Sequence, residues 1–286
     1  MKCDLHVHTV HSGMCTVPLF NRICRESYND PHEVYATLKR RGMDVVTVTD
    51  HDSIDAVEPL RRHPDFFLSE EVSCLTSSGR RLHMGVYGIL ERDHLELQRR
   101  AADMASLLAY LEERELLFSV NHVFSSLTGA RCDADFEEFA ARFPAVETRN
   151  GQMLAMANRH AAALAAQTAK ATVGGSDAHT LASLGRTYTE IPGARTAAEF
   201  LAGLKQGRGA VAGESGDYFK LTRAVASIGC GLMREHRAAL ALAPLLAAVP
   251  AITLINLGLE YAFAHRWGRR VLWNHAGTRQ ATVYDT

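Results

Sequence analysis

The chain opens with two histidines, His6 and His8, inside the run Asp4-Leu5-His6-Val7-His8-Thr9. In a strand, side chains two residues apart point to the same side, so these two imidazoles can share a metal ion. Isolated histidines are usually surface or packing residues, and one such pair alone would indicate little. Four later apolar runs, however, also end in His, Asp or Glu: residues 45–52, 67–71, 117–122 and 171–179. Five such endings in one chain favour an active site.

Imidazole and carboxylate donors together suit divalent Zn, Mn or Fe. The number of candidate donors exceeds the needs of one ion, and two ions about 3.5–4 Å apart, bridged by Asp or Glu, explain the excess. Such a pair lowers the pKa of a bridging water, supplies hydroxide near neutral pH and neutralises charge on a phosphoryl oxygen. These effects favour hydrolysis of a phosphoester.

Strands and helices alternate as far as about residue 213, which predicts a parallel β/α architecture, most simply a barrel. A helix should begin after Asp30, because Asp30 can cap it and Pro31 suits its first position. We expect strands near 3–8, 45–49, 66–69, 81–89, 117–122, 145–147, 171–176 and 209–212, and helices near 32–41, 54–62, 93–115, 133–142, 152–170 and 196–206. In such barrels the chemistry lies at the strand ends, where the His, Asp and Glu residues occur.

Composition is that of a globular protein, with 286 residues, 47% hydrophobic and 22% charged. The net charge of −1 gives no basic bias, so charge does not indicate a nucleic acid partner. Six scattered cysteines without a Cys-x-x-Cys pair suit reduced thiols. No apolar signal-peptide core precedes Asp4, and we therefore expect a cytoplasmic protein.

The chain changes character after residue 213, which predicts a catalytic domain over 1–213 and a helical extension over 214–286. Residues 238–259 contain no charge and are long enough to span a membrane, with arginines on both sides. Pro244 and Pro250 interrupt the run. Two readings stay open: a membrane-associated segment, or a buried or self-associating helical hairpin packed on the barrel.

Taken together, the motifs resemble those of the PHP (polymerase and histidinol phosphatase) family. The matching pieces occur in the family's order: Asp4-Leu5-His6-Val7-His8-Thr9, Thr49-Asp50-His51-Asp52, Glu71-Val72-Ser73, His83, Asn121-His122 and Gly175-Ser176-Asp177-Ala178-His179. The resemblance implies a distorted β/α barrel of seven strands and metal-dependent phosphoester hydrolysis.

The same resemblance implies the ligands and catalytic groups. The positions that match metal ligands are His6, His8, His51, Glu71, His83, His122, Asp177 and His179. Glu71 is preferred to Glu70, because the family's acid precedes an apolar and then a small residue. Asp50 and Asp52 would support the ligands. Asp177, His122 and His51 are the candidate catalytic residues, with Asp177 or a nearby histidine protonating the leaving oxygen.

One position departs from the family pattern. Gly13 stands where many members have Asp or His, and His11 could replace it from a shifted position or be a supporting or surface residue. We therefore expect two divalent ions, with a third as the alternative.

Phosphate recognition needs cations, and arginine offers a bidentate fork. The candidates are Arg22 and Arg25 in the first long loop and Arg186 after His179, each with a solvated surface role as the alternative. The expected substrate is a small phosphomonoester or nucleotide. A metal-dependent C–N hydrolase of amidohydrolase type, or a non-catalytic metal-binding scaffold or sensor, are the competing functions. The sequence leaves the oligomeric state open.

Overall fold

The computed structural model describes residues 1–18 and 20–281, and within them the strands form two sheets. The larger sheet has the order β2-β3-β4-β5-β6, made of β2 (Ser69–Leu75), β3 (Arg81–Tyr87), β4 (Leu117–Val120), β5 (Ala145–Asn150) and β6 (Ala171–Gly175). The smaller has the order β1-β7-β8, made of β1 (Lys2–Cys3), β7 (Thr187–Glu190) and β8 (Ala210–Gly213). The fold is a mixed α/β fold.

The larger sheet is only partly parallel. Strands β4, β5 and β6 run parallel, as the alternation of strands and helices predicts, but β2, β3 and β4 pair antiparallel. Residues 76–80 alone join β2 to β3, and so short a connection permits a hairpin but not a parallel crossover. The prediction of an all-parallel sheet was therefore wrong for this part. The short strand β7, antiparallel to β1 and β8, was not predicted.

The predicted strands at 3–8 and 45–49 are buried, extended segments with few ladder hydrogen bonds. Val7 O accepts from Thr49 N at 2.8 Å, and His6 O accepts from Asp177 N at 2.8 Å. Phe67 N donates to Val46 O at 3.1 Å, which links the second segment to the chain entering β2. These bonds connect the two edges of the larger sheet, although the described residues contain no closed barrel of regular strands.

The helices before residue 213 follow the predicted order. They are α1 (Pro31–Arg40), α2 (Val57–Leu60), α3 (Glu91–Arg100), α4 (Met104–Glu113), α5 (Asp133–Arg142), α6 (Ala155–Gln167) and α7 (Ala197–Lys205), with a 3-10 turn η1 (Val10–Ser12) in the first loop. Asp30 caps α1 as predicted, because its side chain accepts from the backbone N of His32 and Glu33. The single helix expected over 93–115 is two helices, since Asp103 caps a new helix by accepting from Ser106 N.

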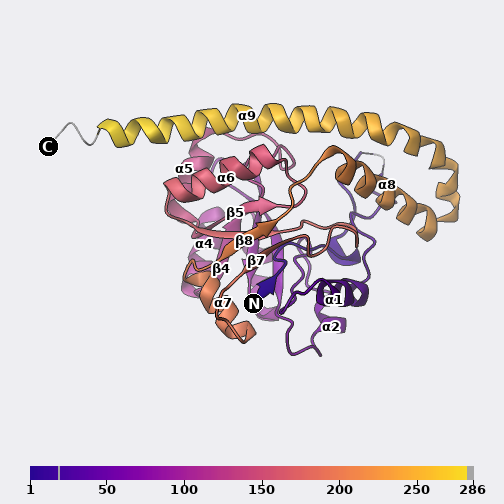
Figure 1. Cartoon of the computed structure of the whole chain (residues 1–286), viewed down its shortest axis with the longest axis horizontal. Coiled ribbons are helices and arrows are strands. Elements are labelled where there is room, and N and C mark those ends of the chain that lie inside the picture. Colours follow the sequence, from indigo (N-terminus) through magenta and orange to yellow (C-terminus); the bar gives the residue numbers. More distant parts are fainter. Residues whose placement is uncertain (19, 282–286) are drawn as a thin grey trace.

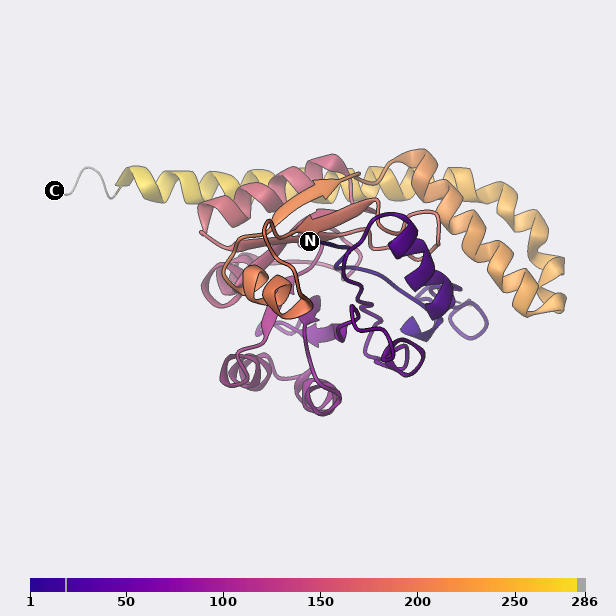
Figure 2. The same ribbon diagram turned by 60° about the horizontal axis from the view of Figure 1, so that its bottom comes forward.

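The C-terminal region is an arm of three helical segments, α8 (Tyr218–Glu235), the 3-10 segment η2 (Arg237–Ala248) and α9 (Val249–Ala281). Helix α9 passes over α6 and α5, while α8 and η2 extend beyond the sheets on the other side (Figures 1 and 2). The second half of α9 joins the main core, where Trp267 stacks on Phe136 with ring centroids 5.2 Å apart. Glu260 holds the same helix by accepting from Ser126 N at 3.1 Å.

The uncharged run 238–259 differs from the rest of this arm. One helical stretch, Arg237–Val271, is long and apolar enough to cross a membrane by length and composition, with a mean hydropathy of 2.3 and only 17% of its most apolar window buried. The run is split between η2 and the first turns of α9, in keeping with Pro244 and Pro250. The expectation of a buried hairpin is therefore not met within the described residues, because most of this run is exposed.

Candidate metal centre

Eight side chains from separate segments meet at one end of the larger sheet. His6 and His8 follow β1, Glu71 and His83 lie on β2 and β3, and the others follow apolar runs or strand ends: His51, His122, Asp177 and His179. Within the described residues the donor atoms form four overlapping groups, each within 4.8 Å: His6–His8–Asp177, His6–Glu71–His122, His51–Glu71–His83 and His8–His51–His179. All eight residues matched to ligand positions thus lie in one cluster.

Glu71 is fully buried at the middle of this cluster, and its two oxygens face different imidazoles. Oε2 lies 3.0 Å from His6 Nε2 and 3.2 Å from His51 Nδ1. Oε1 lies 3.3 Å from His122 Nε2 and 3.7 Å from His83 Nδ1. A carboxylate in this position can bridge two ions.

Asp177 provides the second carboxylate of the cluster. Its Oδ1 lies 3.3 Å from His8 Nε2, 3.5 Å from His6 Nε2 and 3.6 Å from His179 Nδ1. Asp177 and His122 both have positive φ, of 51° and 29°. Residues other than glycine rarely adopt this conformation, and where they do so the cost is often borne to aim a functional side chain.

Two buried carboxylates behind the cluster fix the orientation of its imidazoles. His6 Nδ1 donates to Glu147 Oε1 at 2.7 Å, which leaves His6 Nε2 directed at Glu71. His8 Nδ1 contacts Ser12 Oγ at 2.9 Å, and Ser12 donates to Asp50 at 2.6 Å, so His8 Nε2 also faces inward. Such contacts set the tautomer of a ligating histidine. Asp50 is thus connected to His8 through the hydroxyl group of Ser12.

Glu147 is a residue whose position the sequence analysis did not identify as part of the site. Besides His6 it accepts from His122 N at 2.8 Å and from Asn150 Nδ2 at 3.0 Å. It is buried on β5, the one parallel strand without a predicted ligand. The signal was present, because Glu147 follows the apolar pair Ala145-Val146 as the ligands follow their own apolar runs.

Charge makes the cluster ready to bind cations. Burial alone would raise the pKa of Glu71, but His6, His51 and His83 around it hold that pKa well below its usual value. Burial likewise opposes ionisation of Asp177, yet His6 and its neighbours keep its pKa well below normal. Burial lowers the pKa of His8 strongly and that of His83 to about 3, so both are neutral donors at neutral pH. Ionised carboxylates and neutral imidazoles are the forms that bind metal. Against the effect of burial, the carboxylate of Glu71 raises the pKa of His6 and of His122, so a bound ion would displace a proton from these two imidazoles.

The donor set fits divalent ions better than it fits a closed hydrogen-bond network. His8 Nε2 and His51 Nδ1, which face the carboxylates of the cluster, are buried without a hydrogen-bond partner among the described residues, although buried polar atoms are normally paired. Ligands about 2.1 Å from a tetrahedral Zn lie roughly 3.4 Å apart, which matches the 3.0–3.7 Å separations around Glu71. The residues present therefore fit divalent metal ions.

A third group of donors lies at the outer edge of the cluster. His51 and His179 meet His8 there, and Glu26 Oε2 lies 3.6 Å from His51 Nε2. Glu26 comes from the irregular first loop and was not predicted. His11, the candidate replacement for the missing acid at Gly13, points elsewhere, with Nδ1 4.0 Å from Asp55 Oδ2.

The three candidate substrate-binding arginines occupy different surroundings. Arg25 pairs with Glu235 on α8 at 2.9 Å, and Arg22 is exposed on the same first loop. Arg186 pairs with Glu214 at 3.0 Å and lines a cavity beside the loop that carries Asp177 and His179. Arg186 thus lines a concave surface that borders the loop after Asp177 and His179.

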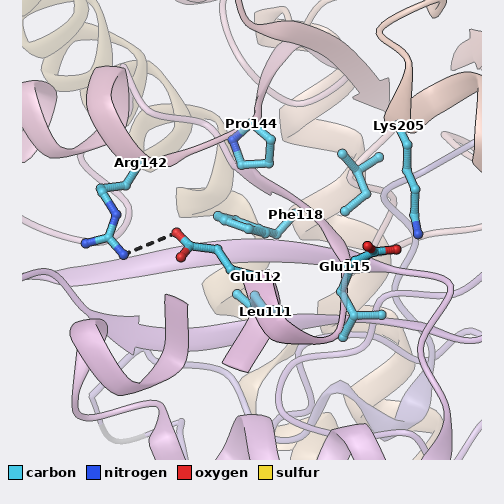
Figure 3. A pocket seen from close by; sticks show the side chains of 9 residues that line it. Leu111, Glu112, Glu115, Phe118, Arg142, Pro144 and Lys205 are labelled. Carbon is cyan, nitrogen blue, oxygen red and sulfur yellow. Dashed lines mark hydrogen bonds and ion pairs between the residues drawn. The ribbon is translucent and has the colours of Figure 1, made fainter. Parts of the chain in front are cut away.

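A separate cavity of about 280 Å³ lies at the other end of β4, away from the cluster (Figure 3). It is lined by the start of that strand, whereas His122 follows the strand's far end. Arg142 and Glu112 pair across its rim at 3.2 Å, and Glu115 and Lys205 lie on its opposite side. It offers no group of metal donors comparable to the cluster among the described residues.

Comparison with known proteins finds similarity over part of the chain. The family model PHP_C, described as PHP-associated, matches residues 155–208. An uncharacterized protein of Methanocaldococcus jannaschii is 35% identical over 54 residues, which cover 19% of this chain and 30% of that protein, so less than a third of its length is matched.

Solved structures are similar over more of the chain. The crystal structure of PsfC from Pseudomonas syringae has a TM-score of 0.57 at 21% identity and covers 82% of this chain and 98% of its own, which establishes a shared fold. The lesion-specific endonuclease PfuEndoQ from Pyrococcus furiosus has a TM-score of 0.47 at 16% identity, over 72% of this chain and 56% of its own. The segment 155–208 that matches the PHP-associated model includes Asp177 and His179, two of the eight side chains of the cluster.

Proposed function

We propose that the chain hydrolyses a phosphoester of a small phosphorylated substrate, a phosphomonoester or nucleotide, with divalent ions held in the cluster. The observation that carries the proposal is Glu71, whose two oxygens face two different groups of imidazoles at 3.0–3.7 Å. A bridging carboxylate of this kind is typical of two-ion hydrolytic sites.

The chain offers donors for two ions and a further group for a third. His6, His8 and Asp177 would hold one ion, and His83 and His122 another, with Glu71 between them. His51, His179 and Glu26 are the donors for a third. Bound Zn, Mn or Fe would supply hydroxide near neutral pH and neutralise phosphoryl charge.

The chain's own residues would handle substrate and protons. Of the three candidate catalytic residues, His51 and His122 are the ones that could protonate the leaving oxygen, and His51 is the less buried of the two, facing the outer donors. Asp177, whose pKa is well below normal, would be ionised and would act as a ligand. Arg186 is our preferred phosphate-orienting group. Arg25 would have to leave Glu235 to contact substrate, and Arg22 would have to reach in from the exposed loop.

A distorted seven-stranded barrel over residues 1–213, with 214–286 as its helical extension, fits this function. Support comes from the bonds of the 4–8 and 45–50 segments, because Thr49 N–Val7 O and Asp177 N–His6 O join the two edges of the larger sheet through them. Such closure would bring five or more strand ends to one rim.

The uncharged run 238–259 would attach the protein to a lipid surface. Its exposed side chains include Leu254 and Ile255, 63% and 64% exposed, and arginines lie on both sides of it. A long exposed apolar run with flanking basic residues is typical of interfacial membrane binding.

The deciding experiment measures metal content and hydrolysis of p-nitrophenyl phosphate on one sample purified without chelator. Two or more equivalents of metal, with hydrolysis that EDTA abolishes and Zn or Mn restores, is the expected result, and a nucleotide panel would then narrow the substrate. Bound metal without turnover of any phosphoester, but with turnover of amides, would replace the proposal by a C–N hydrolase. Bound metal with no turnover at all would leave a metal-binding scaffold.

A further inference from the structure

A second concave surface borders the loop that follows Asp177 and His179. It is a cavity of about 560 Å³ between the loop after β6 and the first turns of α8, a volume typical of small-ligand sites. The residues that line it are mainly polar or charged: Thr180, Ser183, Arg186, Glu214, Asp217, Lys220, Arg223 and Ser227, with two alanines.

Lys220 is the residue of this cavity whose side chain would gain most from a bound ligand. It lies in the first turn of α8 and is only 9% exposed, yet its Nζ has no hydrogen-bond partner among the described residues. Glu214 Oε2 lies 3.6 Å from this atom, within ion-pair distance but too far for a hydrogen bond. A buried ammonium without a hydrogen-bonded partner is costly. Burial lowers the pKa of Lys220, and a bound anion would offset that effect.

The two acids of the cavity are shared with other groups, and Glu214 Oε2 is the one carboxylate oxygen within ion-pair distance of Lys220 among the described residues. Glu214 Oε1 pairs with Arg186 at 3.0 Å, and Asp217 Oδ1 accepts from the backbone N of Lys220 at 2.9 Å as the cap of α8. Three cationic side chains, Arg186, Lys220 and Arg223, thus face two carboxylates across this cavity, and Lys220 has a loose ion pair but no hydrogen bond among the described residues. Hydroxyl groups of Thr180, Ser183 and Ser227 border the same space.

The cavity is continuous with the metal cluster along the chain. Thr180 directly follows His179, and the loop that carries Asp177 continues through Ser183 to Arg186. A substrate that reaches from the cluster to the cavity would lie along this loop. Its second charged group would then meet Lys220.

We propose that this cavity binds a second anionic group of the substrate, a phosphate or a carboxylate, separate from the phosphoester that is hydrolysed. The inference rests on the proposed function and narrows it to phosphoesters with two anionic groups. Lys220 and Arg223 would be the residues that set this specificity.

The first arm of the test measures binding of inorganic phosphate to the metal-loaded full chain by titration calorimetry. We expect one equivalent at the metals and one in the cavity, and Lys220→Met should lose the second or weaken it at least tenfold. Arg223→Met, at an exposed position that cannot endanger folding, should weaken it in the same direction. Lys205→Met, on the distant cavity of Figure 3, is the matched control and should bind as the unchanged chain does. Equal stoichiometry and affinity in Lys220→Met and the control would overturn the site.

The second arm separates a substrate group from free phosphate. We would compare kcat/KM for alkyl monophosphates with that for alkanediol bisphosphates and phosphoalkanoates of increasing length. A preference of tenfold or more at one spacer length, lost in Lys220→Met, is the expected result. Phosphate bound through Lys220 without any such preference would overturn the substrate assignment. If no phosphoester is hydrolysed at all, the proposed function fails, while the calorimetric stoichiometry still decides the cavity.

Discussion

The metal cluster and the C-terminal arm depart in opposite ways from the usual distribution of polar and apolar side chains. Around Glu71 the chain buries carboxylates and imidazoles that water would solvate better, whereas residues 238–259 expose leucine and isoleucine that a core would bury. Each departure costs folding free energy unless something outside the chain offsets it. Divalent ions can do so for the cluster and a lipid surface for the arm. The buried charges of the cluster and the exposed apolar side chains of the arm thus mark the two regions that a bound partner would stabilise.

Replacing Glu71 by Gln should have the largest effect at the cluster. The amide keeps the shape but removes the charge that faces His6, His51, His83 and His122. Even residues that only orient metal ligands change affinity or activity 10–100-fold, so loss of a bridging ligand should lower metal affinity by about a thousandfold or more. Metal content and phosphoester hydrolysis would report it.

Glu70→Gln is the matched control for that substitution. Glu70 is the next residue on β2 but lies on the other face, where its Oε2 contacts His94 Nδ1 at 2.5 Å. It should retain the metal stoichiometry of the unchanged chain. Equal loss of metal in the Glu71→Gln and Glu70→Gln variants would mean that metal binding depends on the total negative charge of β2 and not on the position of Glu71 between the imidazoles.

Removing the ions should lower the free energy of unfolding of the domain formed by residues 1–213. The helices of the arm should not unfold before this domain does. At metal concentrations 100 to 1,000 times Kd, bound ions add about 3–4 kcal/mol to the free energy of unfolding. Chelation should therefore lower the melting temperature by roughly 5–15 °C. Differential scanning calorimetry with and without EDTA would measure this. An unchanged transition would show that histidine–carboxylate pairing alone compensates the buried charge.

Replacing Glu147 by Gln tests whether support behind the ligands matters as the geometry suggests. Glu147 accepts from both His6 Nδ1 and the backbone of His122, so the change should misorient His6. Supporting contacts of this kind are worth about 10–100-fold in metal affinity. Competition with a fluorescent chelator would measure the loss. An effect as small as that of Glu70→Gln would remove Glu147 from the site.

The sequence predicted the cluster better than it predicted the strands around it. His6, His8 and His51 could be named because their motifs are local, while Glu26 could not, since it reaches His51 only through the folding of an irregular loop. The split at Asp103 and the hairpin between β2 and β3 depend on a single cap and a short connection. Hydrophobic periodicity predicts neither the split helix nor the hairpin, because it indicates which side chains are buried and not where the chain turns.

The smallest effect is expected on the arm, from the double substitution Leu254→Lys and Ile255→Lys. Both side chains are more than 60% exposed, so the free energy of unfolding should change by no more than about 0.5 kcal/mol. Binding to vesicles of phosphatidylcholine and phosphatidylglycerol should nevertheless fall about tenfold, since each lysine removes apolar surface from the bilayer boundary. Leu95→Lys on α3, at a position 64% exposed, is the matched control and should leave vesicle binding unchanged. Equal vesicle binding by all three chains, measured by co-sedimentation, would show that the exposed run does not face lipid. A lower mass of the double variant in solution would then identify a second copy of the chain as its partner.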